Sequence, residues 1–210
     1  PIHPAIIWAD QRSASECVEL IELLGADRYA AIAGTLPATG FMASTLLWLR
    51  RHDPTLLDRI DQVMLPKDYV RLKLTDSIAT DPSDAAATGL FDISAGAWSS
   101  EIIGAAGLPA HIFPPVQASQ ALAGELTPEA AAALGVAAGI PVVVGSADQP
   151  AQGIGNGIIA PGKAAISISS GGQVVTPIVR QGMNAIPTDP RLHVFNHAIP
   201  GMWYILGAIL

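Results

Sequence analysis

The stretch Ile140-Pro-Val-Val-Val-Gly-Ser-Ala-Asp-Gln-Pro-Ala-Gln-Gly-Ile-Gly-Asn-Gly157 carries the strongest indication of the fold. Its three consecutive valines, residues 142–144, form a short apolar run that is typical of a buried strand. The run ends at Gly145, and the first acidic residue after it is Asp148. Ligands of open α/β sheets bind beyond the carboxyl ends of such strands, so this carboxylate suits a base beside a small polar ligand. The alternative is that Asp148 caps the helix that follows.

The composition predicts one large or two small domains with a substantial core. Half of the 210 residues are hydrophobic, 14% are charged and the mean hydropathy is +0.40. A net charge of -7 without a Lys/Arg cluster argues against a nucleic-acid partner. The uncharged run 130–147 contains two glycines and a proline, which favours a helix, a turn and a strand over a membrane span. The single cysteine, Cys17, excludes an internal disulfide and indicates a reducing, cytoplasmic compartment.

Apolar periodicity and turn residues predict the elements outside this stretch. Helices are expected at residues 13–24, 43–51, 54–61, 98–106 and 128–134, and from residue 66 onward. Strands are expected at 4–10, 63–65 and 142–144, on both sides of a hairpin turn at 169–172, and at 191–199 and 202–206. Ser13 and Glu16 form a capping-box pattern, and Gly25 ends the helix that follows. Segment 78–92, rich in small and hydroxyl side chains, is expected to be a polar loop, with a groove lining as the alternative.

The spacing or the context of the residues argues against three common kinds of site: a P-loop, a zinc site and the active site of a serine hydrolase. Residues 157–163 resemble a P-loop, but Ala164 replaces the hydroxyl that holds magnesium and a strand is expected where a helix is required. His193 and His197 lie in a predicted strand, where four residues span about 13 Å, too far for one zinc ion. Ser15 and Ser170 lack the G-x-S-x-G context of a serine hydrolase.

The predicted turn Ser169-Ser-Gly-Gly172 is a candidate anion site. Successive small residues in a turn present several backbone N–H groups to one side. The hydroxyls of Ser169 and Ser170 would add two donors for a phosphate oxygen. The alternative is a hairpin turn without a ligand.

Asp148 and the hydroxyl-glycine turn some twenty residues later resemble the FGGY carbohydrate kinases of the sugar kinase/actin/Hsp70 superfamily. Six blocks carry this resemblance in the family's order: residues 8–12 (WADQR), 40–48 (GFMASTLLW), 65–69 (LPKDY), 80–92 (TDPSDAAATGLFD), 145–149 (GSADQ) and 167–172 (SISSGG). Within the family, residues 66–69, 83–86 and 197–200 are most similar to xylulokinases.

The resemblance implies an α/β protein of the ribonuclease H-like (actin-like ATPase) fold. Residues 1–158 would form most of the N-terminal sugar-binding domain, and residues 159–210 the first strands of the C-terminal nucleotide-binding domain. The sequence begins with Pro1 instead of a methionine, and it stops at Leu210 within an apolar run. We therefore expect it to be a piece of a longer protein. The family's first phosphate loop would precede Pro1 and its adenine pocket would follow Leu210.

The implied activity is transfer of a phosphoryl group from ATP, with Mg2+, to a sugar hydroxyl, most closely that of D-xylulose. Asp148 matches the family's catalytic base, and Gln149 would bind a second sugar hydroxyl. Ser170 and Gly171, with Ser169 and Gly172 in the same loop, would hold the γ-phosphoryl group. A homodimer is a further expectation.

Two departures from the family pattern keep alternatives open. Thr45 replaces the signature lysine, and Ser169 replaces a glycine that allows close backbone approach. A kinase for another ketose, a polyol or glycerol, and a non-catalytic sugar-binding member of the fold, are the alternatives.

Overall fold

The computed structural model describes residues 1–168, 172–180, 189 and 191–209. Its helices are α1 (Ala14–Leu24), α2 (Ala26–Ala33), α3 (Met42–His52), α4 (Pro54–Leu57), α5 (Pro66–Thr75), α6 (Pro82–Ala86), α7 (Ser100–Ala105), the 3-10 turn η1 (Ala110–Ile112), α8 (Pro128–Leu134) and α9 (Asp148–Gly155). Its strands are β1 (Phe91–Asp92), β2 (Ala97–Trp98), β3 (Leu122–Glu125), β4 (Pro141–Val143), β5 (Ala165–Ile168), β6 (Gly172–Val179), β7 (Leu192–Asn196) and β8 (Met202–Ile209).

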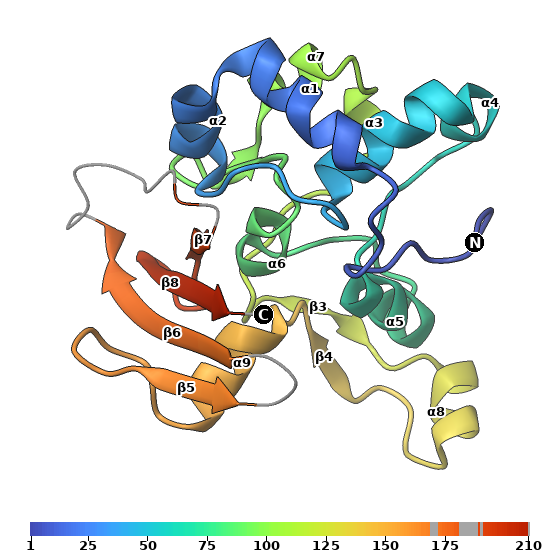
Figure 1. Ribbon diagram of the computed structural model, residues 1–210. Coiled ribbons are helices and arrows are strands. Elements are labelled where there is room, and N and C mark those ends of the chain that lie inside the picture. The colour runs from blue at the N-terminus through green and yellow to red at the C-terminus, as the bar shows by residue number, and fades with distance from the viewer. Residues whose placement is uncertain (169–171, 181–188, 190, 210) are drawn as a thin grey trace.

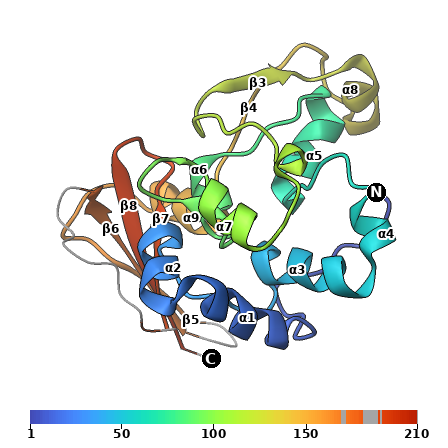
Figure 2. The same ribbon diagram turned by 90° about the horizontal axis from the view of Figure 1, so that it is seen from above.

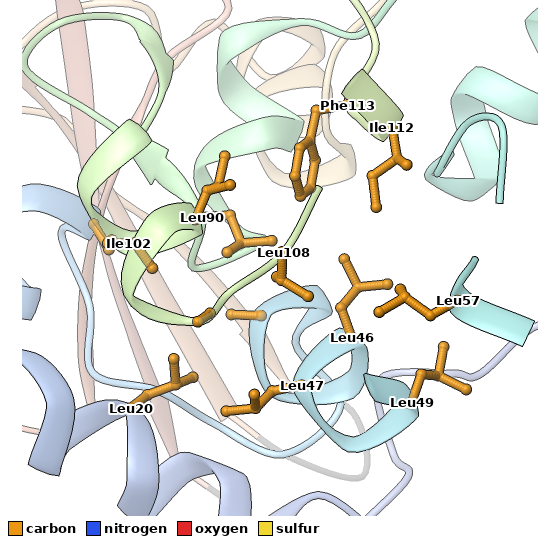
Figure 3. Packing of buried hydrophobic residues seen from close by; sticks show 14 of the residues in the cluster. Leu20, Leu46, Leu47, Leu49, Leu57, Leu90, Ile102, Leu108, Ile112 and Phe113 are labelled. Carbon is orange, nitrogen blue, oxygen red and sulfur yellow. The ribbon is translucent and has the colours of Figure 1, made fainter. Parts of the chain in front are cut away.

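The first half of the chain packs its helices around a leucine-rich core. Helices α1, α2, α3, α4 and α7 gather on one side of the molecule (Figure 1). Leu20 from α1, Leu47 from α3 and Ile102 from α7 meet in their midst and are almost fully buried (Figure 3). Burying each such side chain contributes about 1.5–3 kcal/mol, so this cluster is the main source of stability in the helical part.

The strands after residue 164 form a four-stranded antiparallel sheet in the order β5-β6-β8-β7. Helix α6 contacts β7 and lies between the helical part and this sheet (Figures 1 and 2). Phe91, Val194 and Tyr204 belong to a second buried cluster at this junction. Strands β3 and β4 form a separate antiparallel pair, on which α5 packs.

Gly34 allows the chain after α2 to touch the sheet. Its φ is +73°, and a Cβ atom there would lie 1.9 Å from the carbonyl oxygen of Val194. The Val194 amide donates to the Gly34 carbonyl at 2.7 Å. A side chain at residue 34 would therefore separate the helical part from β7.

Many sequence-based expectations are confirmed. Helices occur as predicted in the regions of α1, α3, α5, α7 and α8, and Gly25 ends α1. Helices α4, α6 and α8 share one start signal, an Asp or Thr side-chain cap followed by proline. The two antiparallel pairs β5–β6 and β7–β8 also form where strands were expected. Of the turn predicted at residues 169–172, residues 169–171 lie outside the described residues, and Gly172 begins β6.

Several expectations are wrong. Residues 4–10 and 63–65 are not strands, α4 ends at Leu57, and α2 was not anticipated. The capping box is absent because the Ser13 hydroxyl donates to Ser44 Oγ instead of capping α1. Segment 78–92 is not a polar loop: it contains α6 and β1, and most of its polar side chains are buried.

The valine run forms a strand, but not the buried one that was predicted. Val143 is 52% exposed, and among the described strands β4 pairs with β3 alone, in antiparallel fashion. Val144, one residue beyond the strand, is the buried member of the run. Asp148 therefore follows an antiparallel pair of strands rather than a strand in a parallel sheet.

Candidate active site

Asp148 is the first residue of α9 and its side chain is exposed. Ala147 occupies the N-cap position, so the alternative that Asp148 caps the helix is wrong. Asp148 Oδ1 accepts a hydrogen bond from the amide of Gln149 at 2.7 Å. A carboxylate in the first turn is favoured by the positive end of the helix dipole. Asp148 thus combines a defined backbone position with a carboxylate that a ligand can reach.

The backbone before Asp148 forms a corner, residues 144–147, that other segments hold in place. The Val144 amide donates to Ala121 O at 2.9 Å, and the Gly145 amide donates to Ser119 O at 2.9 Å. The Val144 carbonyl accepts from Arg71 Nη1 at 2.8 Å. The corner is therefore bound both to the segment before β3 and to helix α5.

A side-chain bond completes this attachment. The Ala147 amide donates to Ser83 Oγ at 3.0 Å, and the Ser83 hydroxyl donates to Asp81 Oδ2 at 2.5 Å. Ser119 Oγ donates to the same carboxylate oxygen at 2.7 Å. Ser83 and Asp81 are fully buried, so helix α6 supplies a polar anchor beneath the corner.

Five charged side chains of α5 and α6 form a cluster next to the anchor. Lys67 Nζ lies 2.7 Å from Asp68 Oδ1, 3.1 Å from Asp81 Oδ1 and 3.7 Å from Asp84 Oδ2. Arg71 Nη1 donates to Asp68 Oδ1 at 2.9 Å. The Asp68, Arg71 and Asp81 side chains are at most 3% exposed. Three carboxylates and two cations leave the cluster with one negative charge in excess.

Burial and this excess negative charge both raise the pKa of Asp84. Burial, only partly opposed by Lys67, raises the pKa of Asp84 from 3.8 to about 7, and the charges of Asp81, Asp68 and Asp148 raise it further. Burial alone would lower the pKa of Lys67, but its hydrogen bond to Asp68 and the neighbouring carboxylates raise it above its usual value. Asp148 therefore interacts electrostatically with the cluster, although its side chain is exposed.

A groove of about 410 Å³ adjoins the corner. Gly145 and Ser146 line it from the corner, and residues 198–200 line it from the turn between β7 and β8. The remaining lining residues are Ser119, Gln120, Val143, Ala151 and Ile154. The corner thus separates a buried charge cluster from an open groove.

Of the other residues predicted to bind sugar or phosphate, the structure describes Gln149 and Gly172. Gln149 is the second residue of α9 and is half-buried. Gly172 is the first residue of β6 and pairs with Ile168. Ser169, Ser170 and Gly171 lie outside the described residues, so their approach to Asp148 stays a prediction.

Residues 8–12 and the stretch that begins at Gly40, two of the blocks that resemble the family, lie against each other. A Cβ atom at Gly40, where φ is +77°, would lie 1.9 Å from the Trp8 carbonyl oxygen. Hydrogen bonds from Arg12 lower the pKa of Asp10, and the Arg12 guanidinium lies 5.0 Å from the Trp48 ring centre. Thr45 lines a cavity of about 230 Å³ beside this contact. Trp8 itself is 76% exposed.

The described residues do not offer a ready-made site for a metal ion. Among them, no group of three His, Cys, Asp or Glu side chains could hold one. The buried carboxylates at Lys67 are already paired with cations. Mg2+ is commonly bound by one or two carboxylates together with the phosphates of a substrate, rather than by protein ligands alone. Of these two arrangements, the described residues fit the one that includes substrate phosphates. None of the described helices is long and apolar enough to cross a membrane.

Sequence reasoning found Asp148 but missed the residues that surround it. Lys67, Asp81 and Ser83 were noticed only as members of family blocks, and Arg71 and Ser119 were not noticed. An available signal was the spacing of charges: in a chain with 14% charged residues, seven charged residues fall within residues 67–84 around apolar positions, and five of them form the cluster.

Comparison with known proteins identifies relatives of the whole chain. Residues 1–155 match the FGGY family of carbohydrate kinases, N-terminal domain. A xylulose kinase from Escherichia coli (strain K12) is 37% identical over 209 residues, which is 100% of this chain and 42% of the relative. A solved xyloylose kinase from Brucella ovis is 34% identical with a TM-score of 0.87, covering 100% of this chain and 42% of that one. A solved xylulose kinase from Rhodospirillum rubrum is 27% identical with a TM-score of 0.86, covering 96% and 40%.

Proposed function

Because the chain belongs to the FGGY family of carbohydrate kinases, we propose that the protein phosphorylates D-xylulose to D-xylulose 5-phosphate with ATP and Mg2+. The fold is the α/β, ribonuclease H-like (actin-like ATPase) fold expected from the sequence. The chain spans about two-fifths of the curated relatives it matches, 42% in the first. The activity is therefore proposed for the full-length protein.

The observation that carries the proposal is the match of the entire chain to xylulose kinases, combined with the position of Asp148. Asp148 is exposed at the start of α9, and its backbone is held by buried bonds. In the proposed reaction its carboxylate takes the proton of the attacking sugar hydroxyl as that oxygen reaches the γ-phosphorus of ATP. ADP leaves with the electrons of the broken P–O bond.

The remaining assignments belong to the same proposal. Gln149 hydrogen-bonds a second sugar hydroxyl, and Ser169, Ser170, Gly171 and Gly172 hold the γ-phosphoryl group. Mg2+, bound mainly through the phosphates of ATP, would supply positive charge against the phosphate oxygens. We also propose the division into domains 1–158 and 159–210, a cytoplasmic location and a homodimer, the last of which light scattering tests.

A substrate panel and one matched pair of variants test the proposal. ADP release by the full-length protein is measured with ketoses, polyols and glycerol, and D-xylulose is expected to give the highest kcat/KM. Asp148→Asn is expected to lower kcat by at least about a hundredfold. Asp27→Asn is the control, because Asp27 is also an exposed aspartate in the first turn of an eight-residue helix, α2.

Three outcomes would contradict parts of the proposal. A preference for glycerol or another polyol would overturn the assigned sugar. Full turnover by Asp148→Asn would overturn the assigned base. Binding of a pentulose without any transfer from Mg-ATP would instead support a non-catalytic sugar-binding protein, the alternative raised by Thr45 and Ser169.

A further inference from the structure

We propose that Ser83 is a positioning residue, whose hydroxyl determines where the Asp148 carboxylate lies by binding the amide of Ala147. This inference rests on the proposed role of Asp148 as the base. Ser83 is far from Asp148 in sequence and contacts the residue immediately before it, with 3.0 Å between Ala147 N and Ser83 Oγ.

Among the described residues, no other side chain forms a hydrogen bond or an ion pair with the Asp148 carboxylate. Its one hydrogen bond among the described residues comes from the amide of Gln149, its neighbour in the chain. The location of the carboxylate therefore follows from the backbone that enters α9. Since Ala147 is the N-cap residue, its amide lies outside the helical bonding pattern and needs a partner elsewhere. Ser83 Oγ is that partner.

The hydroxyl of Ser83 is oriented by Asp81. Ser83 Oγ donates to Asp81 Oδ2 at 2.5 Å, so its proton points away from Ala147 and a lone pair faces the Ala147 amide. The Ser83 amide donates to the same oxygen at 3.0 Å, which fixes the serine backbone as well. Lys67 Nζ lies 3.1 Å from the other oxygen of Asp81 and forms a salt bridge with it. The chain Lys67–Asp81–Ser83–Ala147 thus runs from α5 through α6 to the residue before Asp148.

All of the protein groups in this chain except Lys67 are shielded from water. The exposed fraction is 0% for Asp81 and Ser83, and 9% for Ala147. Water is therefore not available to replace the Ser83 hydroxyl when it is removed, and the Ala147 amide must shift or stay unpaired. A displacement of about 1 Å at a reacting group is enough to lower turnover about a hundredfold.

Ser119 offers a matched control. Its hydroxyl donates to the same Asp81 oxygen at 2.7 Å, and it is also buried, but its side chain does not bind Ala147. Ser83→Ala and Ser119→Ala therefore each remove one hydroxyl from Asp81 Oδ2. Only Ser83→Ala removes the partner of the Ala147 amide.

The test compares both variants in the full-length protein with Asp148→Asn. We expect Ser83→Ala to lower kcat by about ten- to a hundredfold with KM values for sugar and ATP within about twofold. Ser119→Ala is expected to keep kcat within about threefold of wild type while losing a similar amount of thermal stability. Equal loss of kcat in the two serine variants, or none in Ser83→Ala, would overturn the inference.

Two further measurements separate this inference from the assignment of the base. Amide hydrogen exchange at Ala147 is expected to accelerate in Ser83→Ala and not in Ser119→Ala, which tests the anchor without any activity. If Ser83→Ala does not fold, Ala147→Pro removes the same bond from the other side, since its φ of -56° suits proline. An inactive Asp148→Asn with a fully active Ser83→Ala would refute the anchor alone, and an active Asp148→Asn would refute the base.

Discussion

Replacing Asp84 by asparagine should make the stability of the protein less sensitive to pH. The side chain of Asp84 is 19% exposed and lies 3.7 Å from Lys67, beside two other carboxylates. Burial and those carboxylates raise its pKa from 3.8 to about 7 in the folded protein. The asparagine keeps the shape of the side chain and removes the titrating group.

The sign follows from which state binds the proton. Below a pH of 3.8 the Asp84 carboxyl is protonated in both states and contributes nothing to the pH dependence. As the pH rises, the unfolded state ionises first, so the folded protein loses stability until the folded pKa of about 7 is passed. Above that value both states are ionised, and the loss becomes constant.

The magnitude follows from the same two pKa values. Between about pH 5 and about pH 8, this one group should reduce the free energy of unfolding by about 2.5 kcal/mol. The difference in stability between Asp84→Asn and wild type should change by that amount in favour of the variant. Titrating groups that do not interact with Asp84 contribute equally in the two proteins, so their contributions cancel.

Urea unfolding followed by tryptophan fluorescence at both pH values measures this difference. Asp84→Asn also removes the ion pair with Lys67. That ion pair lowers the pKa of Asp84, so its effect is already contained in the folded pKa of about 7. A stability difference that changes by less than about 0.5 kcal/mol between the two pH values would refute the reasoning. So would a change in favour of the wild type.

Three other predictions concern the charge cluster and the core. Asp148→Asn should lower the pKa of Asp84, because the Asp148 charge helps to raise it, and carbon-13 NMR of the Asp84 carboxyl would detect this. Gly34→Ala should cost several kcal/mol in urea unfolding, because its Cβ would lie 1.9 Å from Val194 O. Gly25→Ala meets no atom within 4 Å and should cost only the backbone strain of its φ of +78° and ψ of 144°, about 1–3 kcal/mol. Equal losses at the two glycines would contradict the close contact. Leu47→Ala, at 1% exposure, should lose about 2–5 kcal/mol, and Leu23→Ala, at 46%, less than about 1 kcal/mol; similar values would contradict the assigned core.

Local sequence signals predicted the elements that depend on neighbouring residues. Helices α1, α3, α5 and α8 carry apolar periodicity, proline at the first turn or glycine at the end, and all of these act within a few residues. The position of Asp148 just after the valine run was predicted for the same reason, whereas the sequence left open whether a glycine-rich turn or a helix follows, and the structure has α9 there. Family resemblance, rather than periodicity, supplied its proposed role.

Errors arose where distant parts of the chain determine the outcome. Residues 4–10 have an apolar pattern suited to a strand but find no partner strand among the described residues. The valine run was expected to be buried, yet in the part of the chain that the structure describes β4 has β3 as its single neighbouring strand, and Val143 is 52% exposed. Strand burial depends on which surfaces meet in three dimensions, and the run itself does not contain that information.

The sequence by itself determined that a carboxylate follows an apolar strand and a glycine, because strand and glycine signals are local. Only the tertiary structure decided what holds that carboxylate. Lys67 from α5, Ser83 from α6 and Ser119 before β3 converge on Asp81, and Ser83 alone of these side chains reaches the amide before Asp148. Buried polar groups need partners, and such partners come from segments that no local pattern connects.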